Sequence, residues 1–291
     1  MKSRIILGLC CLLGSMATNA QTRITVEGFE NPESVYAKGK YLFVTNLGPN
    51  LDPTAKDGDG YISVVDRKTG NVVQRKFIIG LNSPKGMIVK HGKIHFTDVD
   101  KVVAYSIKTK KKVWEADLSG FGVTYANDIA MGCGKLFVSS TDRNSIYKVC
   151  RSGKVKMLNV QEDMPGANGL YKGCGKLFVA NYGRNDAADG GFGYIKGCKK
   201  KKYKEIQKGG VYDGITKVCG RLVLSNWVDT KENKGKIVAY RMHKKQMKDI
   251  ELGKTFNGPA DIYADRCKKK LWIPAMREGS ITAISFKELK Q

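Results

Sequence analysis

The chain has 291 residues, 42% of them hydrophobic, and a formal net charge of +24. It contains no low-complexity tract, and no apolar run is long enough to span a bilayer. The positive charge favours contact with anionic surfaces such as lipid headgroups or acidic polysaccharide. The lysines are spread over expected turns and outer strands and do not alternate with aromatic residues, so a nucleic-acid partner is not expected.

The first twenty residues are predicted to be a signal peptide. Lys2 and Arg4 form a positively charged start, residues 5–13 are apolar, and Thr18-Asn19-Ala20 offers small residues for cleavage. The mature protein is therefore expected to begin at Gln21, to be exported to the periplasm or the extracellular space, and to have no transmembrane segment.

A short apolar segment recurs six times along the rest of the chain. The copies start 52, 42, 41, 45 and 49 residues apart, and they are Leu42–Asn46, Ile94–Asp98, Leu136–Ser140, Leu177–Asn181, Leu222–Asn226 and Leu271–Ala275. A repeat of this length, with several short strands in each unit, is typical of a β-propeller. We therefore predict an all-β fold, a six-bladed β-propeller of four-stranded antiparallel blades, that occupies residues 21–291 as one domain.

The two ends of the chain are expected to meet in the last blade. That blade runs out at Ser285-Phe286 without an outer strand of its own, and Thr22–Glu27 alternates apolar and polar residues as a strand does. Pairing of this N-terminal strand would close the ring and remove exposed sheet edges. The longest insertion, Leu47–Asp57, is expected to cover one mouth of the central channel.

Polar residues stand at the start of the strand that precedes each repeated segment. They lie nine residues before the first five copies and ten before the sixth, and they are Glu33, Lys85, Asn127, Asn168, Asp213 and Asp261. The first strand of each blade lines the channel of a propeller, so these side chains are expected to converge on one axis.

The oxygen atoms of this set suit a divalent metal ion. Carboxylates of Glu33 and Asp213 and the amide of Asn168 form a hard ligand set that favours Ca²⁺, with Mn²⁺ or Zn²⁺ as alternatives. The competing interpretation is that these residues only cap inner strands. Lys85 could pair with Glu33, contact a substrate carboxylate, or simply reach out of the channel mouth.

Six cysteines remain after the signal peptide, and an even number in an exported chain favours disulfides. Symmetry about two hairpin turns predicts the bonds Cys133–Cys150 and Cys174–Cys198. Cys219–Cys267 follows by elimination.

The chain resembles the family of six-bladed propellers that includes senescence marker protein, gluconolactonase and luciferin-regenerating enzyme. The resemblance spans the mature chain and is carried by Asn31-Pro32-Glu33-Ser34-Val35, Ser83-Pro84-Lys85-Gly86-Met87, Asn127-Asp128-Ile129-Ala130, Asn168-Gly169-Leu170 and Asp213-Gly214-Ile215. It implies that Glu33, Asn168 and Asp213 bind one divalent cation. It also implies that Asp213 is the catalytic general base.

The same resemblance suggests which residues contact substrate. It assigns that role to Asn127, with Asp128 beside it, and Lys85 is a further candidate. Tyr125 departs from the pattern, because sugar-lactonase members of the family carry an arginine there to hold the sugar. A gluconolactone-type substrate is therefore not expected, whereas the metal set is unaffected.

Two functions follow from these observations. The first is a metal-dependent hydrolase that opens a lactone or a related ester. The second is a non-catalytic exported propeller that binds an anionic ligand or a protein partner and holds a structural ion or none.

Overall fold

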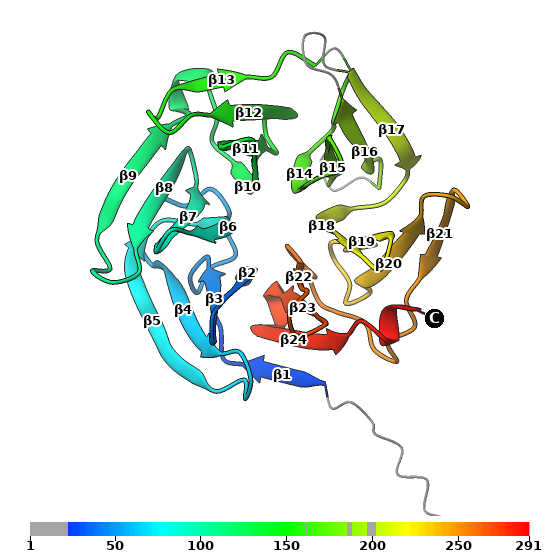
Figure 1. Cartoon of the computed structure of the whole chain (residues 1–291), viewed down its shortest axis with the longest axis horizontal. Coiled ribbons are helices and arrows are strands. Elements are labelled where there is room, and N and C mark those ends of the chain that lie inside the picture. Colours follow the sequence, from blue (N-terminus) through cyan, green and yellow to red (C-terminus); the bar gives the residue numbers. More distant parts are fainter. Residues whose placement is uncertain (1–22, 161, 185–187, 197–201, 291) are drawn as a thin grey trace, which may run out of the picture.

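The computed structural model describes residues 23–160, 162–184, 188–196 and 202–290. They form six separate four-stranded antiparallel sheets, arranged as blades around a central axis (Figure 1). The predicted six-bladed β-propeller is therefore confirmed. No helix among these residues is both long enough and apolar enough to cross a membrane. The predicted signal peptide, residues 1–20, lies outside the described residues, so export stays a prediction.

The first three blades each run from an inner strand at the axis to an outer strand at the rim. Blade 1 consists of β2 (Pro32–Lys38), β3 (Tyr41–Asn46), β4 (Gly60–Asp66) and β5 (Val72–Leu81). Blade 2 consists of β6 (Pro84–Lys90), β7 (Lys93–Asp98), β8 (Lys101–Ser106) and β9 (Lys112–Asp117). Blade 3 consists of β10 (Ala126–Gly132), β11 (Lys135–Ser140), β12 (Ser145–Val149) and β13 (Val155–Met157).

The next two blades repeat this arrangement, and short 3-10 helices lie at Ser119–Phe121, Met276–Glu278 and Glu288–Lys290. Blade 4 consists of β14 (Ala167–Gly173), β15 (Lys176–Asn181), β16 (Gly191–Lys196) and β17 (Lys202–Lys208). Blade 5 consists of β18 (Tyr212–Val218), β19 (Arg221–Asn226), β20 (Lys236–Arg241) and β21 (Gln246–Asp249).

The sixth blade joins the two ends of the chain. Its strands are β22 (Tyr263–Asp265), β23 (Lys270–Ala275), β24 (Ser280–Ser285) and, at the rim, β1 (Ile24–Glu27). β1 pairs antiparallel with β24, with Ile24 opposite Ala283 and Glu27 opposite Ser280. The predicted closure by the N-terminal strand is therefore confirmed from residue 24 onward, and it removes the free edge that β24 would otherwise expose.

Apolar side chains fill the space between neighbouring blades. Phe43 of blade 1 and Phe96 of blade 2 belong to one such cluster. Because a blade is covered on both faces, all of Leu42, Phe43 and Val44 are buried, with exposures of 2% or less. A strand buried on both sides consists of a continuous apolar run. Each such side chain contributes about 1.5–3 kcal/mol, which explains why this segment is the most regular part of the repeat.

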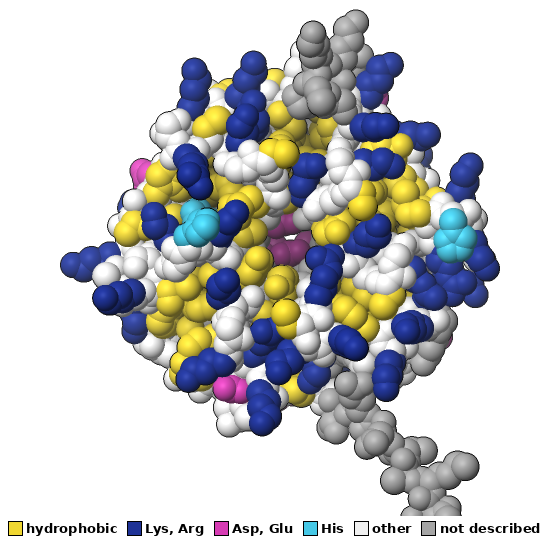
Figure 2. All heavy atoms as spheres, in the orientation of Figure 1, with side chains coloured by type: hydrophobic (Ala, Val, Ile, Leu, Met, Phe, Trp, Pro, Cys, Tyr) yellow, Lys and Arg dark blue, Asp and Glu magenta, His cyan; other side chains and the backbone are white. Residues whose placement is uncertain are grey.

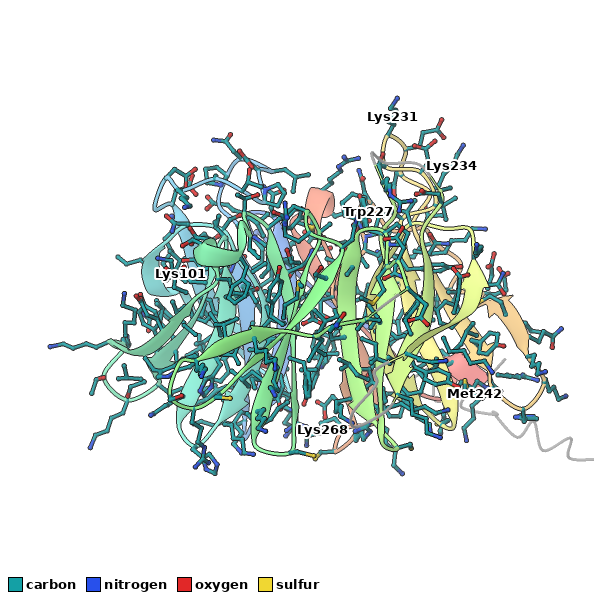
Figure 3. The ribbon with its side chains drawn as sticks, turned by 90° about the horizontal axis from the view of Figure 1, so that it is seen from above. Lys101, Trp227, Lys231, Lys234, Met242 and Lys268 are labelled. Carbon is teal, nitrogen blue, oxygen red and sulfur yellow. The ribbon has the colours of Figure 1, made fainter. Side chains whose placement is uncertain are left out.

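The ring has two faces of different construction. The turn face is formed by the turns that join the first strand of a blade to the second and the third to the fourth, together with residues 286–290. The loop face is formed by the connections between second and third strands and between blades. In the side view of Figure 3, Met242 and Lys268 lie on the turn face, whereas Lys101, Trp227 and Lys231 lie on the loop face.

The cysteine prediction requires correction. The described cysteines are free thiols, namely Cys133, Cys150, Cys174, Cys219 and Cys267. The predicted bonds Cys133–Cys150 and Cys219–Cys267 are therefore not formed. Cys174 is itself a free thiol, and Cys198, its expected partner, lies outside the described residues.

The strand register explains why the first pair does not meet. Cys133 lies in the two-residue turn between β10 and β11, where the chain reverses direction. Leu136 pairs with Val149, which places Lys135, and not Cys133, opposite Cys150. The true register of the hairpin therefore differs by two residues from the symmetry that would pair the two cysteines. The other predicted pair, Cys219 and Cys267, lies in turns of two different blades.

Candidate functional site

Each of the first five inner strands contains a β-bulge near its start. In β2 the pairing register shifts between Pro32 and Val35, and β6, β10, β14 and β18 shift at the equivalent place. In three blades the second bulged residue donates its backbone N–H to a hydroxyl on the next strand. These bonds are Ser34 to Thr45 Oγ1 (2.9 Å), Asp128 to Ser139 Oγ (2.9 Å) and Gly214 to Ser225 Oγ (2.7 Å). A bulge re-aims side chains, and here it does so at the channel.

The first bulged residues occupy one equivalent position around the axis. They are Glu33, Lys85, Asn127, Asn168 and Asp213, each with an exposure of 5% or less. The sixth blade departs from the pattern, because Pro259 pairs with Ala275 as Pro32 pairs with Asn46. Ala260 therefore occupies the sixth ring position, and Asp261 lies one residue beyond it. Asp261 is ten residues before Leu271 because the turn between β22 and β23 has four residues, whereas the corresponding turn in the other blades has two.

The second bulged residues form another layer, closer to the turn face. Asp261 Oδ2 accepts a hydrogen bond from Ser34 Oγ at 2.6 Å, and Asp128 Oδ2 accepts one from the backbone N–H of Leu170 at 2.6 Å. Gly86, Gly169 and Gly214 complete the layer. The inner strands converge so closely that a Cβ on Gly169 would lie 2.1 Å from the carbonyl oxygen of Asp213. Figure 2 shows acidic side chains at the centre of the ring.

Four oxygens in the first layer are buried and have no hydrogen-bond partner. They are Glu33 Oε2, Asn127 Oδ1, Asn168 Oδ1 and Asp213 Oδ1. Two of these side chains are oriented by their other atoms, since Asn127 Nδ2 donates to Thr141 Oγ1 at 3.0 Å and Trp227 Nε1 donates to Asp213 Oδ2 at 3.1 Å. Buried acceptors of this kind are the ligands that a hard cation takes.

The ligand chemistry of this set is limited to oxygen. Among the described residues, no group of three or more His, Cys, Asp or Glu side chains is arranged to hold a metal ion. The four oxygens come instead from two carboxylates and two amides, a combination that Ca²⁺ accepts readily and that offers no soft ligand. The residues present therefore fit a hard divalent cation.

The channel concentrates carboxyl groups in a buried environment. Burial raises the pKa of Asp213 to about 8, with a further contribution from Asp261, and burial raises the pKa of Asp261 to about 7. Burial and the neighbouring carboxylates raise the pKa of Glu33 and of Asp128 well above the usual range. Like charges so close together cannot all ionise, so these groups hold protons unless a cation compensates them.

Lys85 is a structural anchor at the channel mouth. Its ammonium donates hydrogen bonds to Pro53 O at 2.6 Å and to Ser83 O at 2.8 Å, and it lies 5.1 Å from the centre of the Tyr125 ring. Ser83 Oγ adds a bond to Asp52 O at 2.8 Å. Burial lowers the pKa of Lys85 to about 8, against the opposing effect of nearby carboxylates. These bonds tie the loop 47–59 to the second blade.

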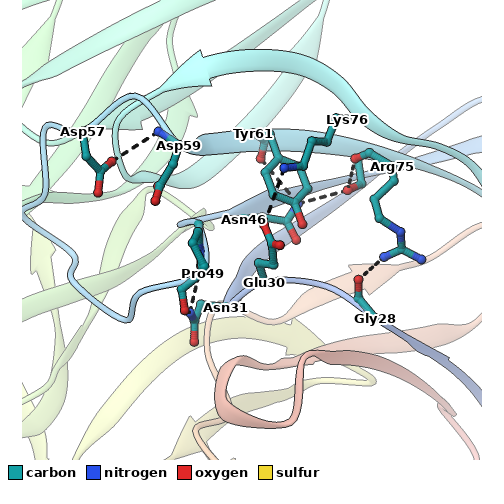
Figure 4. A network of polar contacts seen from close by, with 12 residues as sticks. Gly28, Glu30, Asn31, Asn46, Pro49, Asp57, Asp59, Tyr61, Arg75 and Lys76 are labelled. Carbon is teal, nitrogen blue, oxygen red and sulfur yellow. Dashed lines mark hydrogen bonds and ion pairs between the residues drawn. The ribbon is translucent and has the colours of Figure 1, made fainter.

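The loop 47–59 is also held from the first blade. Asn31 Nδ2 donates hydrogen bonds to Gly48 O at 2.9 Å and to Pro49 O at 3.2 Å, as Figure 4 shows for Pro49. Asn31 has a left-handed φ of 51°, a conformation that Asn tolerates better than most residues. Leu47, Leu51 and Pro53 line the cavity at the loop face. The predicted cover over one channel mouth is therefore present.

That cavity has a volume of about 310 Å³. Its lining combines the ring residues Glu33, Asn127 and Asp213 with the rings of Tyr125 and Trp227. A partly apolar hollow with a few polar groups is typical of a small-molecule site. Asp128, predicted to act beside Asn127, instead lines a separate cavity of about 300 Å³ at the turn face, together with Asp261. The structure thus places these two neighbours in successive layers of the channel, where they line different cavities.

Two contributors to the site were missed from the sequence. Trp227 orients Asp213, and Thr141 orients Asn127. Each directly follows a repeated segment, Trp227 after Asn226 and Thr141 after Ser140. The residue directly after the repeated segment therefore reaches over the channel mouth. Its fixed position after the repeat could have identified both residues from the sequence.

Neither a protein-family model nor a characterised protein sequence matches the chain. Solved structures resemble it, among them a catalytically inactive virginiamycin B lyase from Staphylococcus aureus with quinupristin, with a TM-score of 0.57 and 16% identity over 90% of this chain and 98% of that one. A streptogramin B lyase gives a TM-score of 0.61 and 15% identity over 90% and 96% of the chains. Hydrazine synthase of Kuenenia stuttgartiensis gives a TM-score of 0.62 and 11% identity over 91% of this chain and 79% of that one. Likeness at this identity shows the propeller fold alone, and membership of the gluconolactonase-like family stays a prediction.

Proposed function

We propose that Glu33, Asn168 and Asp213 bind one divalent cation, Ca²⁺ in preference to Mn²⁺ or Zn²⁺, with Asn127 at its open side. The observation that carries this proposal is the set of four buried oxygens without hydrogen-bond partners, all from the same bulge position of their blades. Their number and chemistry match a Ca²⁺ ligand set that is completed by water or substrate.

The proposed activity is hydrolysis of a lactone or a related ester at the loop-face cavity, in an exported protein. A divalent cation, when bound, polarises a carbonyl oxygen and lowers the pKa of water. We assign the general-base role to Asp213, the ring carboxylate whose orientation is fixed by the hydrogen bond from Trp227. Tyr125 and Trp227 would form the walls against which the substrate packs. Lys85, through its bonds to the cavity-lining loop, would set the shape of the cavity.

Calorimetric titration tests the cation site. Chelator-treated protein is titrated with Ca²⁺, Mn²⁺ and Zn²⁺, and wild type is compared with Asp213→Asn and with Asp261→Asn. We expect wild type and Asp261→Asn to bind one cation and Asp213→Asn to lose measurable binding. Asp261→Asn is the matched control, since it removes a carboxylate from the same channel but from the second layer. Absence of binding by wild type, or equal binding by Asp213→Asn, would show that the ring has no cation site.

A panel of lactones and esters tests the activity separately. We expect turnover that disappears with chelator, returns with added Ca²⁺, and is lost in Asp213→Asn. A protein that binds the cation but hydrolyses none of the panel would contradict the hydrolase. That result would favour the second candidate, a non-catalytic propeller with a structural ion. Exposed turn-face residues such as Lys108, Lys244 and Lys268 support that candidate, because their positive charge suits an anionic partner.

A further inference from the structure

The two faces of the ring differ in charge. On the turn face, the turn between β8 and β9 holds Lys108, Lys110 and Lys111, and the turn between β22 and β23 holds Arg266, Lys268 and Lys269. Among the described turn-face connections Glu288 is the one acidic residue. Figure 2 shows that Lys and Arg side chains are distributed over all blades of this face rather than gathered in one stripe.

The loop face carries charges of both signs. The loop 47–59 contains Asp52, Asp57 and Asp59 beside a single lysine, and the connection between β13 and β14 contains Glu162 and Asp163. Among the described connections, the excess of positive charge therefore lies on the turn face. A separation of charge across a flat disc gives the molecule a preferred orientation at a charged surface.

The turn-face lysines are available to an external partner. Lys108, Lys111, Lys244 and Lys268 are exposed, and none of them forms an ion pair with another described residue. Arg67 is different, because it is committed to the buried carboxylate of Asp265. The free ammonium groups sit on tight turns anchored in the sheets, so little ordering is needed before they meet a partner.

Three aromatic rings near this face are already covered by the protein's own cations. Lys40 lies 5.1 Å from the ring centre of Tyr41, Lys176 lies 3.9 Å from that of Tyr194, and Arg266 lies 5.9 Å from that of Tyr171. Rings occupied in this way do not offer the open platforms on which single-stranded nucleic acid stacks its bases. The positive charge therefore serves a partner that presents charge without bases.

We propose that the turn face docks on the surface of an anionic lipid bilayer. A bilayer presents a flat and continuous negative surface, which matches charges spread around a whole disc, whereas a linear polyanion would match a stripe. None of the exposed large hydrophobic side chains of the described residues lies in a turn-face connection, so the contact is electrostatic and does not insert into the hydrocarbon. Docking in this orientation leaves the loop-face cavity open to solution. The inference is independent of any activity of that cavity.

Vesicle sedimentation tests the proposal. The chain from Gln21 onward, which contains the whole closed ring and omits the apolar residues 5–13, is mixed with vesicles of phosphatidylcholine alone or with about one third phosphatidylglycerol. The turn-face variant carries Lys108→Gln, Lys244→Gln and Lys268→Gln. The matched control removes the same charge from the loop face through Lys101→Gln, Lys231→Gln and Lys234→Gln, positions that Figure 3 labels on the opposite side.

We expect wild type to bind only the anionic vesicles and to be released by high salt, since screening shortens the range of exposed charges. The turn-face variant should bind about 100-fold more weakly, because each lysine near an anionic surface contributes a factor of about five. The loop-face control should bind within about twofold of wild type. Equal loss in both variants, or binding to pure phosphatidylcholine, would overturn the proposal. Retention on a sulfated polysaccharide without binding to anionic vesicles would also overturn it and assign the face to a polyanion.

Discussion

Replacing Asp213 with Asn should stabilise the cation-free protein at pH 8 and abolish its response to cations. Asn keeps the side-chain shape and the acceptor for Trp227 Nε1, which lies 3.1 Å away, but it cannot ionise. In the folded protein without a cation, burial raises the pKa of Asp213 to about 8 from an ordinary value of 3.8. The ionised carboxylate is therefore a destabilising element of the cation-free fold.

The sign and size of this effect follow from the two pKa values. Because the folded pKa lies above the unfolded one, the folded state retains a proton that the unfolded chain has lost between pH 4 and pH 8. The stabilisation of the fold by this proton on Asp213 is fully present below the unfolded pKa and is lost as pH rises through this window. At about 1.4 kcal/mol per pKa unit, the loss from Asp213 alone reaches about 5 kcal/mol. For a domain of this size that corresponds to about 10 °C in Tm at pH 8.

Scanning calorimetry of chelator-treated protein at pH 4, 6 and 8 measures the effect. The Asn variant should melt above wild type at pH 8, and the two should converge near pH 4. Added Ca²⁺ should raise the Tm of wild type and leave that of the variant unchanged. Glu232→Gln, an exposed loop-face change, should stay within about 2 °C of wild type. A variant that melts at or below wild type at pH 8 without cation would refute the reasoning, because the buried charge would then carry no cost.

Three further outcomes are expected. Lys85→Met removes the ammonium that ties the loop 47–59 to blade 2, so the free energy of unfolding should fall by about 1–3 kcal/mol. Limited proteolysis should then cut this loop faster, while cation binding is retained. Unchanged cleavage would show that Lys85 does not anchor the loop. Gly169→Ala would place a Cβ 2.1 Å from the carbonyl oxygen of Asp213 and should cost at least about 2 kcal/mol, whereas Gly120→Ala, which meets open space, should be nearly neutral in denaturant unfolding. The described cysteines should react with a maleimide without prior reduction, and mass spectrometry that finds them linked in pairs would contradict the free thiols.

Much of the fold could be predicted because the same burial of one strand is needed in every blade, and this produces a repeated apolar segment in the sequence. Leu42, Phe43 and Val44 are buried on both sides by neighbouring blades, so the same apolar run is needed in every copy. The pairing of Ile24–Glu27 with the last blade was also predictable, because that blade lacked one strand. The cysteine pairing was not predictable from hairpin symmetry, since a two-residue turn takes Cys133 off the line of its strand.

The candidate site divides in the same way. The sequence alone determined which residue types reach the channel, because the inner-strand position is fixed relative to the apolar repeat. Five of the six residues predicted for the ring occupy the equivalent bulge position in the structure. Only the tertiary structure decided that Asp261 and Asp128 face the turn-face end, that Lys85 is bound to the covering loop, and that Trp227 orients Asp213. The physical reason is that a bulge places adjacent residues in successive layers of the channel. One residue of register therefore separates groups that the sequence shows as neighbours, and contacts between blades have no local pattern in the chain.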